Sequence, residues 1–274
     1  MSTAKPTRLL ACGMYAFTEP LREAWTVLLS PLTKILEQTD HSSLSGALQL
    51  LFDTSSDIYQ SPQLFLGHTC GYPYMTRWIQ THQLVCVPEF EISGCSGTQY
   101  SSWFICRSDD QRSTIKSFVG AIAAINGTNS NSGMNVLRYQ ASLHATNGKF
   151  FSNINTSGSH TESMRAVAAG DADIASVDAI SYHHIVESDP MLASAVRVMG
   201  QSVHTTGLPF IMHNNEQMDR STLVDALNQC VEQLSDTYRE HLKLIRFSEV
   251  SETDYEALIR LETEAVATGY PTLS

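Results

Sequence analysis

The chain has 274 residues, of which 42% are hydrophobic, and its formal net charge is −11 at pH 7. This size and composition predict one large domain or two ordinary ones with a sizeable core, and they exclude global disorder. The acidic balance and the lack of a basic cluster argue against nucleic acids and anionic membranes as partners. A negatively charged ligand would therefore have to be held by local dipoles.

The six cysteines are spread along the chain without a Cys-x-x-Cys pair. We therefore predict neither a structural zinc site nor a disulfide framework. His183 and His184 are neighbours in a predicted helix, where adjacent side chains diverge, so they do not indicate a metal site. No metal and no cofactor are predicted.

The residues Leu9–Cys12 have the outline of a lipoprotein cleavage box, but the apolar run before Cys12 is too short for a secretory signal. A first strand over 8–12 is the better interpretation. No run reaches the length of a transmembrane helix. We expect a periplasmic protein if an export signal was removed and a cytoplasmic one otherwise.

Strand and helix patterns alternate along the first part of the chain. After the first strand, leucines, Trp25 and Ile35 follow helical spacing over 21–36, and Pro31 should interrupt this helix. The stretch 42–57 is polar and ambiguous. The segments that follow are strands over 64–66, 84–87 and 100–107, a helix over 74–81, and a loop over 89–98.

The alternation continues to the end. We predict strands over 121–125, 150–155, 173–177, 195–201 and within 207–212, and helices over 113–119, 134–143, 160–169, 179–186, 219–234, 238–243 and 253–268. This order is typical of an α/β fold with mainly parallel sheets. The strands over 100–107 and 195–201 bracket a compact αβ block, which suits an inserted lobe joined by two crossing strands.

One stretch combines the features of an anion site. A small apolar run, Ala121–Ile125, is followed by the polar turn Asn126–Gly133 and then by a helix. Backbone N–H groups at such a helix N-terminus can hold an anion without a basic side chain. Ser130, Asn131 and Ser132 would add side-chain donors. Ordinary N-capping of the helix is the alternative.

Several motifs together identify a family. They are Asn126–Gly133, Gly158–His160, Ala168–Asp178 and Gly207–Pro209, with Thr69–Pro73, Gly94–Tyr100 and Gly269–Pro271 elsewhere in the chain. In their order along the chain, these motifs resemble those of the substrate-binding proteins of phosphate, phosphite and phosphonate ABC transporters. The resemblance implies an α/β, two-lobed type 2 periplasmic-binding-protein-like fold, hinged by two crossing segments, with the ligand in the cleft. Lobe I would be 1–102 and 200–274, and lobe II 103–199.

The resemblance also implies the ligand-binding residues. The family's anion-binding turn, usually Ser-Thr-Ser-Gly, falls on Ser130, Asn131 and Ser132, where Asn131 departs from the pattern. His160 falls on a cleft histidine that can donate a hydrogen bond to a phosphonate oxygen. Asp178 falls on a cleft carboxylate that could accept from a ligand amine or a P–OH group. Asp178 is equally a candidate helix N-cap, and both roles can hold.

Aromatic residues complete the implied site. Tyr15 and Tyr72 follow strand ends in the other lobe, where they could cover the ligand and donate hydroxyl groups. Tyr182 lies one helical turn after Asp178 and could face the same cleft. Thr69 is a further candidate. For each tyrosine, core packing is the alternative.

Three functions remain open from the sequence. The first is a solute-binding protein that captures a small phosphorus oxyanion for an ABC transporter or sensor, with a permease as partner. The second is an enzyme on the same fold acting on a small phosphorylated or anionic metabolite, with Cys70 or Ser132 as nucleophile and His68 or His160 as base. No Gly-x-Ser-x-Gly elbow supports it. The third is a ligand-sensing protein whose closed form binds a partner.

Overall fold

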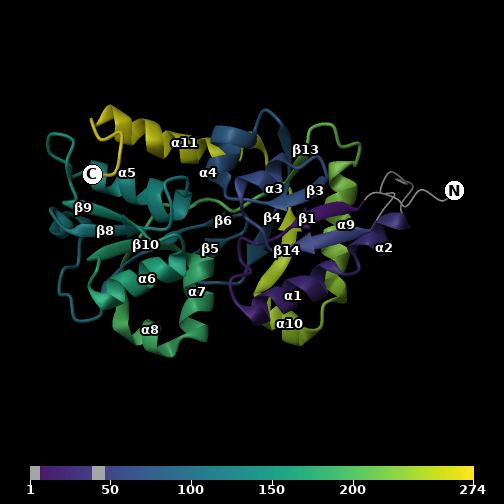
Figure 1. Ribbon diagram of the computed structural model, residues 1–274, viewed down its shortest axis with the longest axis horizontal. Coiled ribbons are helices and arrows are strands. Elements are labelled where there is room, and N and C mark those ends of the chain that lie inside the picture. Colours follow the sequence, from purple (N-terminus) through teal and green to yellow (C-terminus); the bar gives the residue numbers. More distant parts are fainter. Residues whose placement is uncertain (1–6, 39–46) are drawn as a thin grey trace. The chain divides into compact units, whose positions relative to one another are not determined.

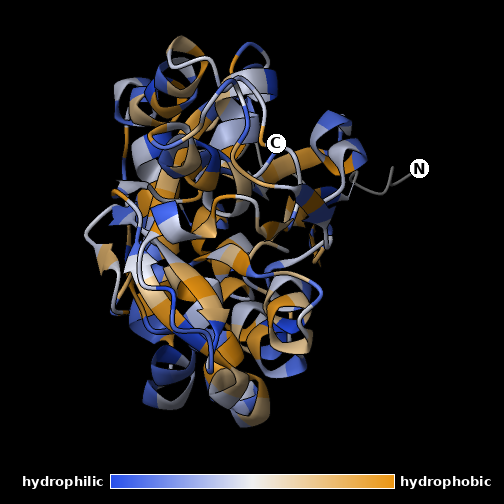
Figure 2. Ribbon diagram, turned by 90° about the vertical axis from the view of Figure 1, so that its left-hand side faces the viewer, coloured by the Kyte–Doolittle hydropathy of each residue, from blue (hydrophilic) through white to orange (hydrophobic). Residues whose placement is uncertain are grey.

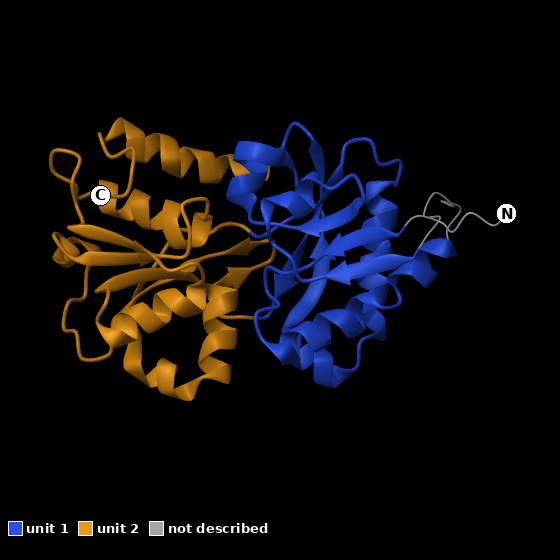
Figure 3. Ribbon diagram, in the orientation of Figure 1, with its two compact units in different colours: residues 1–91, 207–252 blue, residues 92–206, 253–274 orange. Residues whose placement is uncertain are grey.

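The chain forms two compact units (Figures 1 and 3). The computed structural model describes residues 7–38 and 47–274, so part of the ambiguous stretch 42–57 lies outside the described residues. Unit 1 consists of Met1–Glu91 and Gly207–Glu252, and unit 2 of Ile92–Thr206 and Thr253–Ser274. The chain thus passes from one unit to the other three times.

Unit 1 is built on a six-stranded mixed sheet. Its strand order is β14-β4-β13-β3-β1-β2. The strands are β1 (Arg8–Ala11), β2 (Leu48–Leu51), β3 (Leu64–His68), β4 (His82–Phe90), β13 (Phe210–His213) and β14 (Leu244–Ser248). β1 pairs in parallel with β2 and β3, whereas β13 runs antiparallel to β3 and β4, and β14 antiparallel to β4.

Helices flank this sheet. They are α1 (Glu19–Leu29), α2 (Leu32–Glu37), α3 (Ser56–Gln60), α4 (Gly71–Pro73), the π-helical η1 (Tyr74–Trp78), α9 (Arg220–Gln233) and α10 (Asp236–Leu242). Thr18 caps α1, and Pro31 separates α1 from α2, as the sequence predicts. The buried side chains of α1 include Leu21, Trp25 and Leu28, which follow the helical period.

Unit 2 contains a five-stranded sheet and a small three-stranded one. The larger has the order β11-β7-β10-β8-β9 and the smaller β12-β6-β5. The strands are β5 (Cys95–Ser96), β6 (Gln99–Tyr100), β7 (Ser102–Arg107), β8 (Ile122–Ile125), β9 (Asn153–Thr156), β10 (Ile174–Asp178), β11 (Val196–Gln201) and β12 (Thr205–Thr206). β8 pairs in parallel with β9 and β10, and β7 runs antiparallel to β10 and β11.

The helical segments of unit 2 follow these strands. They are the 3₁₀ helix η2 (Ile115–Phe118), the π-helical η3 (Asn131–Asn135), α5 (Val136–Ser142), α6 (His160–Ala169), α7 (Ala179–Ser188), α8 (Pro190–Ala195) and α11 (Glu252–Ala267). Strands are coloured mainly as hydrophobic in Figure 2, whereas helices carry both kinds of residue. Every residue of β10 is buried, as expected for a strand covered on both faces.

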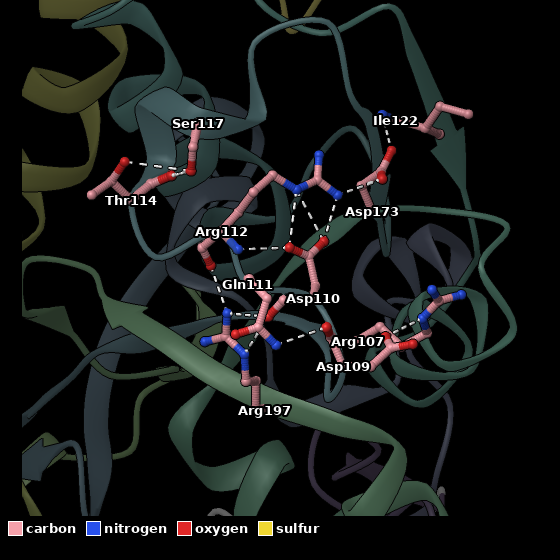
Figure 4. Close-up of polar contacts among 10 residues, drawn as sticks. All are labelled: Arg107, Asp109, Asp110, Gln111, Arg112, Thr114, Ser117, Ile122, Asp173 and Arg197. Carbon is pink, nitrogen blue, oxygen red and sulfur yellow. Dashed lines mark hydrogen bonds and ion pairs between the residues drawn. The ribbon is translucent and has the colours of Figure 1, made fainter.

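An ionic cluster fixes the beginning of β8 (Figure 4). The Asp173 carboxylate accepts a hydrogen bond from the Ile122 backbone N–H at 2.8 Å and pairs with the Arg112 guanidinium at 2.7 Å. Arg112 also binds both carboxylate oxygens of Asp110, and Arg197 donates to the backbone carbonyls of Asp110 and Arg112. The cluster therefore holds one end of the strand whose other end leads into the polar turn.

The units differ from the predicted lobes in their boundaries. The sequence predicts lobe I as 1–102 and 200–274 with two crossings, whereas 92–102, 200–206 and the segment from Thr253 onward belong to unit 2. After the third crossing α11 contacts unit 2, where Leu258 accepts a hydrogen bond from Asn135 and Glu262 pairs with Arg138. Among the described helices, none has the length and hydropathy that crossing a bilayer requires.

Candidate functional site

The polar turn of unit 2 begins a helical segment. Ser130 is its N-cap: the backbone is extended there, and Ser130 Oγ accepts a hydrogen bond from the Gly133 N–H at 3.0 Å. The five residues of η3 continue directly into the seven of α5. The N–H groups of Asn131 and Ser132 stand at the first helical positions, where no intrahelical acceptor exists. The turn therefore presents backbone donors and the positive end of a helix dipole.

Gly133 allows a close approach within the turn. A Cβ atom at this position would lie 1.9 Å from Asn126 Oδ1 and 3.2 Å from His160 Cε1. The Asn126 side chain is in turn 3.4 Å from His160 Nε2, measured from its Nδ2 atom. Glycine thus lets the helix start pack directly against Asn126 and His160.

His160 brings the turn together with β10. It is the first residue of α6, and Ser159 caps this helix through a hydrogen bond from the Glu162 N–H. His160 Nε2 lies 3.0 Å from Ser132 Oγ and 3.1 Å from Asp178 Oδ2. The single ring nitrogen Nε2 therefore contacts both the serine hydroxyl and the carboxylate.

Asp178 ends β10 and caps α7. Its Oδ1 atom accepts a hydrogen bond from the Ser181 N–H at 2.8 Å, and the residue is only 2% exposed. Burial acts to raise the pKa of Asp178, but the hydrogen bonds and charge of His160 and the bonds from Ser181 outweigh it, so the pKa lies below its ordinary value. Asp178 thus both caps α7 and contacts His160.

The ionised carboxylate determines where the protons lie. An aspartate can only accept, so His160 Nε2 must carry the proton that it shares with Asp178. The same nitrogen then has no lone pair left for the Ser132 hydroxyl. The Ser132 proton is therefore free to be donated to another acceptor.

A family model described as "ABC transporter, phosphonate, periplasmic substrate-binding protein" matches residues 63–258. The chain belongs to this phosphonate-binding family. The family and its α/β, two-lobed fold, both predicted from the sequence, are confirmed. Members of the phosphonate-binding family are substrate-binding components of ABC transporters.

Solved structures show the same fold at low sequence identity. A binding protein component of a phosphonate ABC transporter from Pseudomonas aeruginosa aligns with a TM-score of 0.76 and 16% identity, over 97% of this chain and 88% of that one. PhnD1 from Prochlorococcus marinus, solved with methylphosphonate, aligns with a TM-score of 0.66 and 13% identity, over 94% of this chain and 96% of that one. A putative sulfonate-binding protein SsuA from Methylobacillus flagellatus aligns with a TM-score of 0.59 and 12% identity, over 98% of this chain and 89% of that one. No curated protein matches the sequence.

In this phosphonate-binding family member, the Asn131 side chain does not serve as the expected donor at the turn. It is fully buried, and its amide donates to Tyr100 Oη at 3.1 Å and to Thr205 Oγ1 at 3.0 Å. Both amide N–H groups are thus already used. Only the Asn131 backbone N–H remains for a ligand.

The remaining predicted residue of unit 2 is Tyr182. It lies on α7, one turn after Asp178, and is half-buried. Burial raises the pKa of its phenol group. Its phenol is therefore protonated at neutral pH and can act as a donor.

Three predicted residues belong to unit 1. Tyr15 follows β1, and Thr69 and Tyr72 follow β3, its parallel neighbour, so all three follow carboxyl ends at one edge of the sheet. All are buried. The Tyr15 ring packs edge-on against His68 and Phe90, with ring centroids 5.5 Å apart in each case. The Thr69 N–H donates to the Pro209 carbonyl at 2.9 Å.

The geometry at Ser132 differs from a hydrolytic triad. In a Ser-His-Asp triad the serine and the carboxylate contact different ring nitrogens. One nitrogen accepts the serine proton while the carboxylate holds the N–H of the other. Here both contact Nε2. His160 is therefore not placed to activate Ser132 as a nucleophile.

The other candidate base, His68, is a core residue. Its ring stacks on Phe210, with centroids 4.4 Å apart and planes at 3°. Burial lowers its pKa to about 3, and the nearby Leu208 backbone offsets only part of this effect. The sequence offers Cys70 as a nucleophile with His68 as its base. A base buried in this way is largely shielded from a substrate.

Sequence reasoning missed several residues that shape the turn. Ser176 Oγ donates to the Ser132 carbonyl at 2.5 Å from the middle of β10. Asn126 and Gly133 pack against each other, as described above. A serine inside the otherwise apolar buried run of β10 was the available signal for Ser176. Among the described residues, no group of three or more metal-binding side chains is found.

Proposed function

We propose that this protein is a solute-binding protein that captures a small phosphorus oxyanion, such as a phosphonate, phosphite or phosphate, at the polar turn of unit 2. The observation that supports this most directly is the contact of His160 Nε2 with both Ser132 and Asp178. This arrangement directs the Nε2 proton of His160 toward Asp178 and leaves the Ser132 hydroxyl proton for the ligand.

The turn offers several donors to one anion. They are the backbone N–H groups of Asn131 and Ser132 and the hydroxyl of Ser132. Ser130 Oγ accepts from the Gly133 N–H and keeps its own proton to donate. It lies 3.5 Å from Ser132 Oγ, so both hydroxyls can address neighbouring oxygens of one tetrahedral group.

The source of positive potential is the backbone. None of the described hydrogen bonds within this cluster involves lysine or arginine. A helix N-terminus supplies roughly half an elementary charge, and N–H groups pointing at the ligand add directional bonds. Such a site suits an anion in a protein with a net charge of −11.

The family suggests further residues that contact the ligand and a partner that receives it. We propose that Tyr15, Thr69, Tyr72 and Tyr182 contact the ligand through hydroxyl groups, and that an ABC transporter permease receives it. The family description supports a periplasmic location. The phosphonate and sulfonate relatives of the same fold support a tetrahedral oxyanion as the ligand class.

Calorimetric titration tests this function. Wild-type protein is titrated with methylphosphonate, phosphite, phosphate and methanesulfonate, and a variant carrying Ser130→Ala and Ser132→Ala is compared with it. Each lost bond to a charged group should cost about 1.5–3 kcal/mol, so the double variant should bind at least about 100-fold more weakly. Ser142→Ala is the control, since this serine donates to the Tyr139 carbonyl within α5.

The result also separates binding from catalysis. Phosphorus NMR of the ligand after prolonged incubation should show it unchanged. Equal affinity of the wild type and the double variant would contradict the proposed site. Conversion of the ligand would contradict the binding function.

A further inference from the structure

The side chain of Asn131 is turned away from the donors that the proposed function uses. Its Nδ2 atom donates to Tyr100 Oη in β6 and to Thr205 Oγ1 in β12. These partners are 31 and 74 residues away in the sequence. The first residue of η3 is thus tied to two strands of the small sheet.

The same side chain is tied along its own helix. Asn131 Oδ1 accepts from Asn135 Nδ2 at 3.1 Å, and Asn135 Nδ2 also donates to the Leu258 carbonyl of α11 at 2.9 Å. Asn135 Oδ1 accepts from Arg138 Nη2 at 2.7 Å. Asn131 and Asn135 are fully buried, so these bonds are made in a region without competing water.

The bonds of Asn131 leave its amide no donor for a ligand. An amide has two N–H groups, and both are used. Turning either toward an anion would leave a buried tyrosine or threonine hydroxyl without its donor, which is unfavourable. Asn131 can therefore affect binding only through the position of its backbone.

Resting on the proposed function, we propose that Asn131 is a positioning residue. Its side-chain amide bonds Tyr100 and Thr205 and thereby holds the first backbone N–H groups of η3 toward the anion. A further hydrogen bond holds the same turn to β10, since Ser176 donates to the Ser132 carbonyl. The side chain of Asn131, by which this chain departs from the family's usual turn, thus positions the turn and does not contact the ligand.

Removal of the partners, rather than of Asn131, tests the proposal. Tyr100→Phe and Thr205→Val keep the shapes of both side chains and delete both acceptors. Combined, they should weaken methylphosphonate binding about tenfold, and each alone by less, since each deletes one of the two bonds. Ser142→Ala serves as the matched control on α5 and should bind as the wild type does.

Backbone amide chemical shifts provide a readout that general destabilisation would not produce. In the ligand-free double variant, the Ser132 and Gly133 amide signals should move, while those of α7 stay in place. Unchanged signals with unchanged affinity would overturn the positioning role. A large loss of affinity in Asn131→Ala with none in the double variant would also overturn it, because the Asn131 side chain would then contact the ligand itself. If the wild type bound no anion, the proposed function would fail, whereas the amide shifts would still decide the positioning role.

Discussion

Asp178 carries two tasks with its two carboxylate oxygens. Oδ1 caps α7 through the Ser181 N–H, and Oδ2 holds His160. Because both oxygens have partners inside unit 2, the fold satisfies this buried charge without a ligand. The proton arrangement at Ser132 depends on this carboxylate being ionised.

Asp178→Asn should therefore change the ligand profile more than the stability. Asparagine is as good an N-cap as aspartate, so α7 keeps its cap. The loss of the charge frees the His160 proton and should alter the ratio of phosphate to phosphite affinity by about tenfold or more. Calorimetry and urea unfolding measure both effects. An unchanged ligand profile would contradict the role of Asp178 at the site.

His68 makes the stability depend on pH. Its pKa is about 3 in the folded protein and about 6.5 in the unfolded chain. Between these values the unfolded chain binds more protons, so stability is full above pH 6.5 and falls as the pH drops toward 3. At about 1.4 kcal/mol for each unit of pKa difference, the loss should amount to several kcal/mol.

His68→Phe should remove this loss. Phenylalanine suits the stack on Phe210 and cannot titrate. Unfolding at pH 7 and pH 5 should show a smaller pH dependence in the variant than in the wild type. His82, whose pKa burial lowers to about 4, still titrates in the variant, so some dependence will remain. An identical dependence in both proteins would show that His68 is not neutral in the fold.

The sequence predicted candidate site residues but not their orientations. Ser130 and Ser132 could be named from the polar turn before a helix, and His160 and Asp178 from the family resemblance. The direction of the Asn131 side chain could not, because it is set by Tyr100 and Thr205, far away in the chain. Local patterns contain no information about such partners.

The start of η3 is the element at which the candidate site is proposed. It packs against Asn126 and His160 so closely that a Cβ atom at position 133 would displace the Asn126 side chain. The turn Asn126–Gly127 tolerates more, since a Cβ on Gly127 would meet no atom within 4 Å. The two glycines of one turn thus form a natural comparison.

Gly133→Ala should weaken anion binding, and Gly127→Ala should not. The added methyl group would force the Asn126 side chain away and disturb its contact with His160. The Asn126 amide can move, so the variant should fold and lose at least about tenfold in methylphosphonate affinity. Calorimetry of the two variants decides the point. Equal affinities would mean that the packing of the turn is not important for binding.

Elements were predictable where periodicity was long. The helix over 160–169 and most of the predicted strands lie within a residue or two of their predicted places, whereas β4 and β9 differ by three residues at one end. β14 was missed because Leu244–Ser248 is short, does not alternate strictly between apolar and polar residues, and closely follows a helix. The π-helical form of η3 has no sequence signal, since it depends on the Asn135 N–H reaching the Ser130 carbonyl.

The whole molecule is acidic, and its ligand is expected to be an anion. With a net charge of −11, its long-range field repels the ligand that its backbone dipoles attract. The field is screened beyond about 10 Å at 0.1 M salt, whereas the bonds at the turn are not. Salt should therefore favour the encounter.

The association rate of methylphosphonate should rise as ionic strength increases from about 0.01 to about 0.15 M. Stopped-flow measurement of tryptophan fluorescence gives this rate. Sodium chloride and sodium acetate are compared, so that screening is separated from competition by one anion. A steep fall of the rate in both salts would indicate a positively charged site instead.

At this scale the division of the chain was only partly predictable. The two long strands indicated an inserted lobe, and two units are present. The return of the last segment to unit 2 was missed, because the apolar stripe of α11 does not reveal which core it joins. In the structure Leu258 of this helix accepts a bond from Asn135, next to the candidate site.

A crystal structure with bound methylphosphonate tests the central claim most directly. We predict phosphonate oxygens within about 2.7–3.2 Å of the Asn131 and Ser132 backbone nitrogens, with Ser132 Oγ donating to one of them and His160 still on Asp178. Methylphosphonate bound elsewhere, with no oxygen at these nitrogens, would contradict the account.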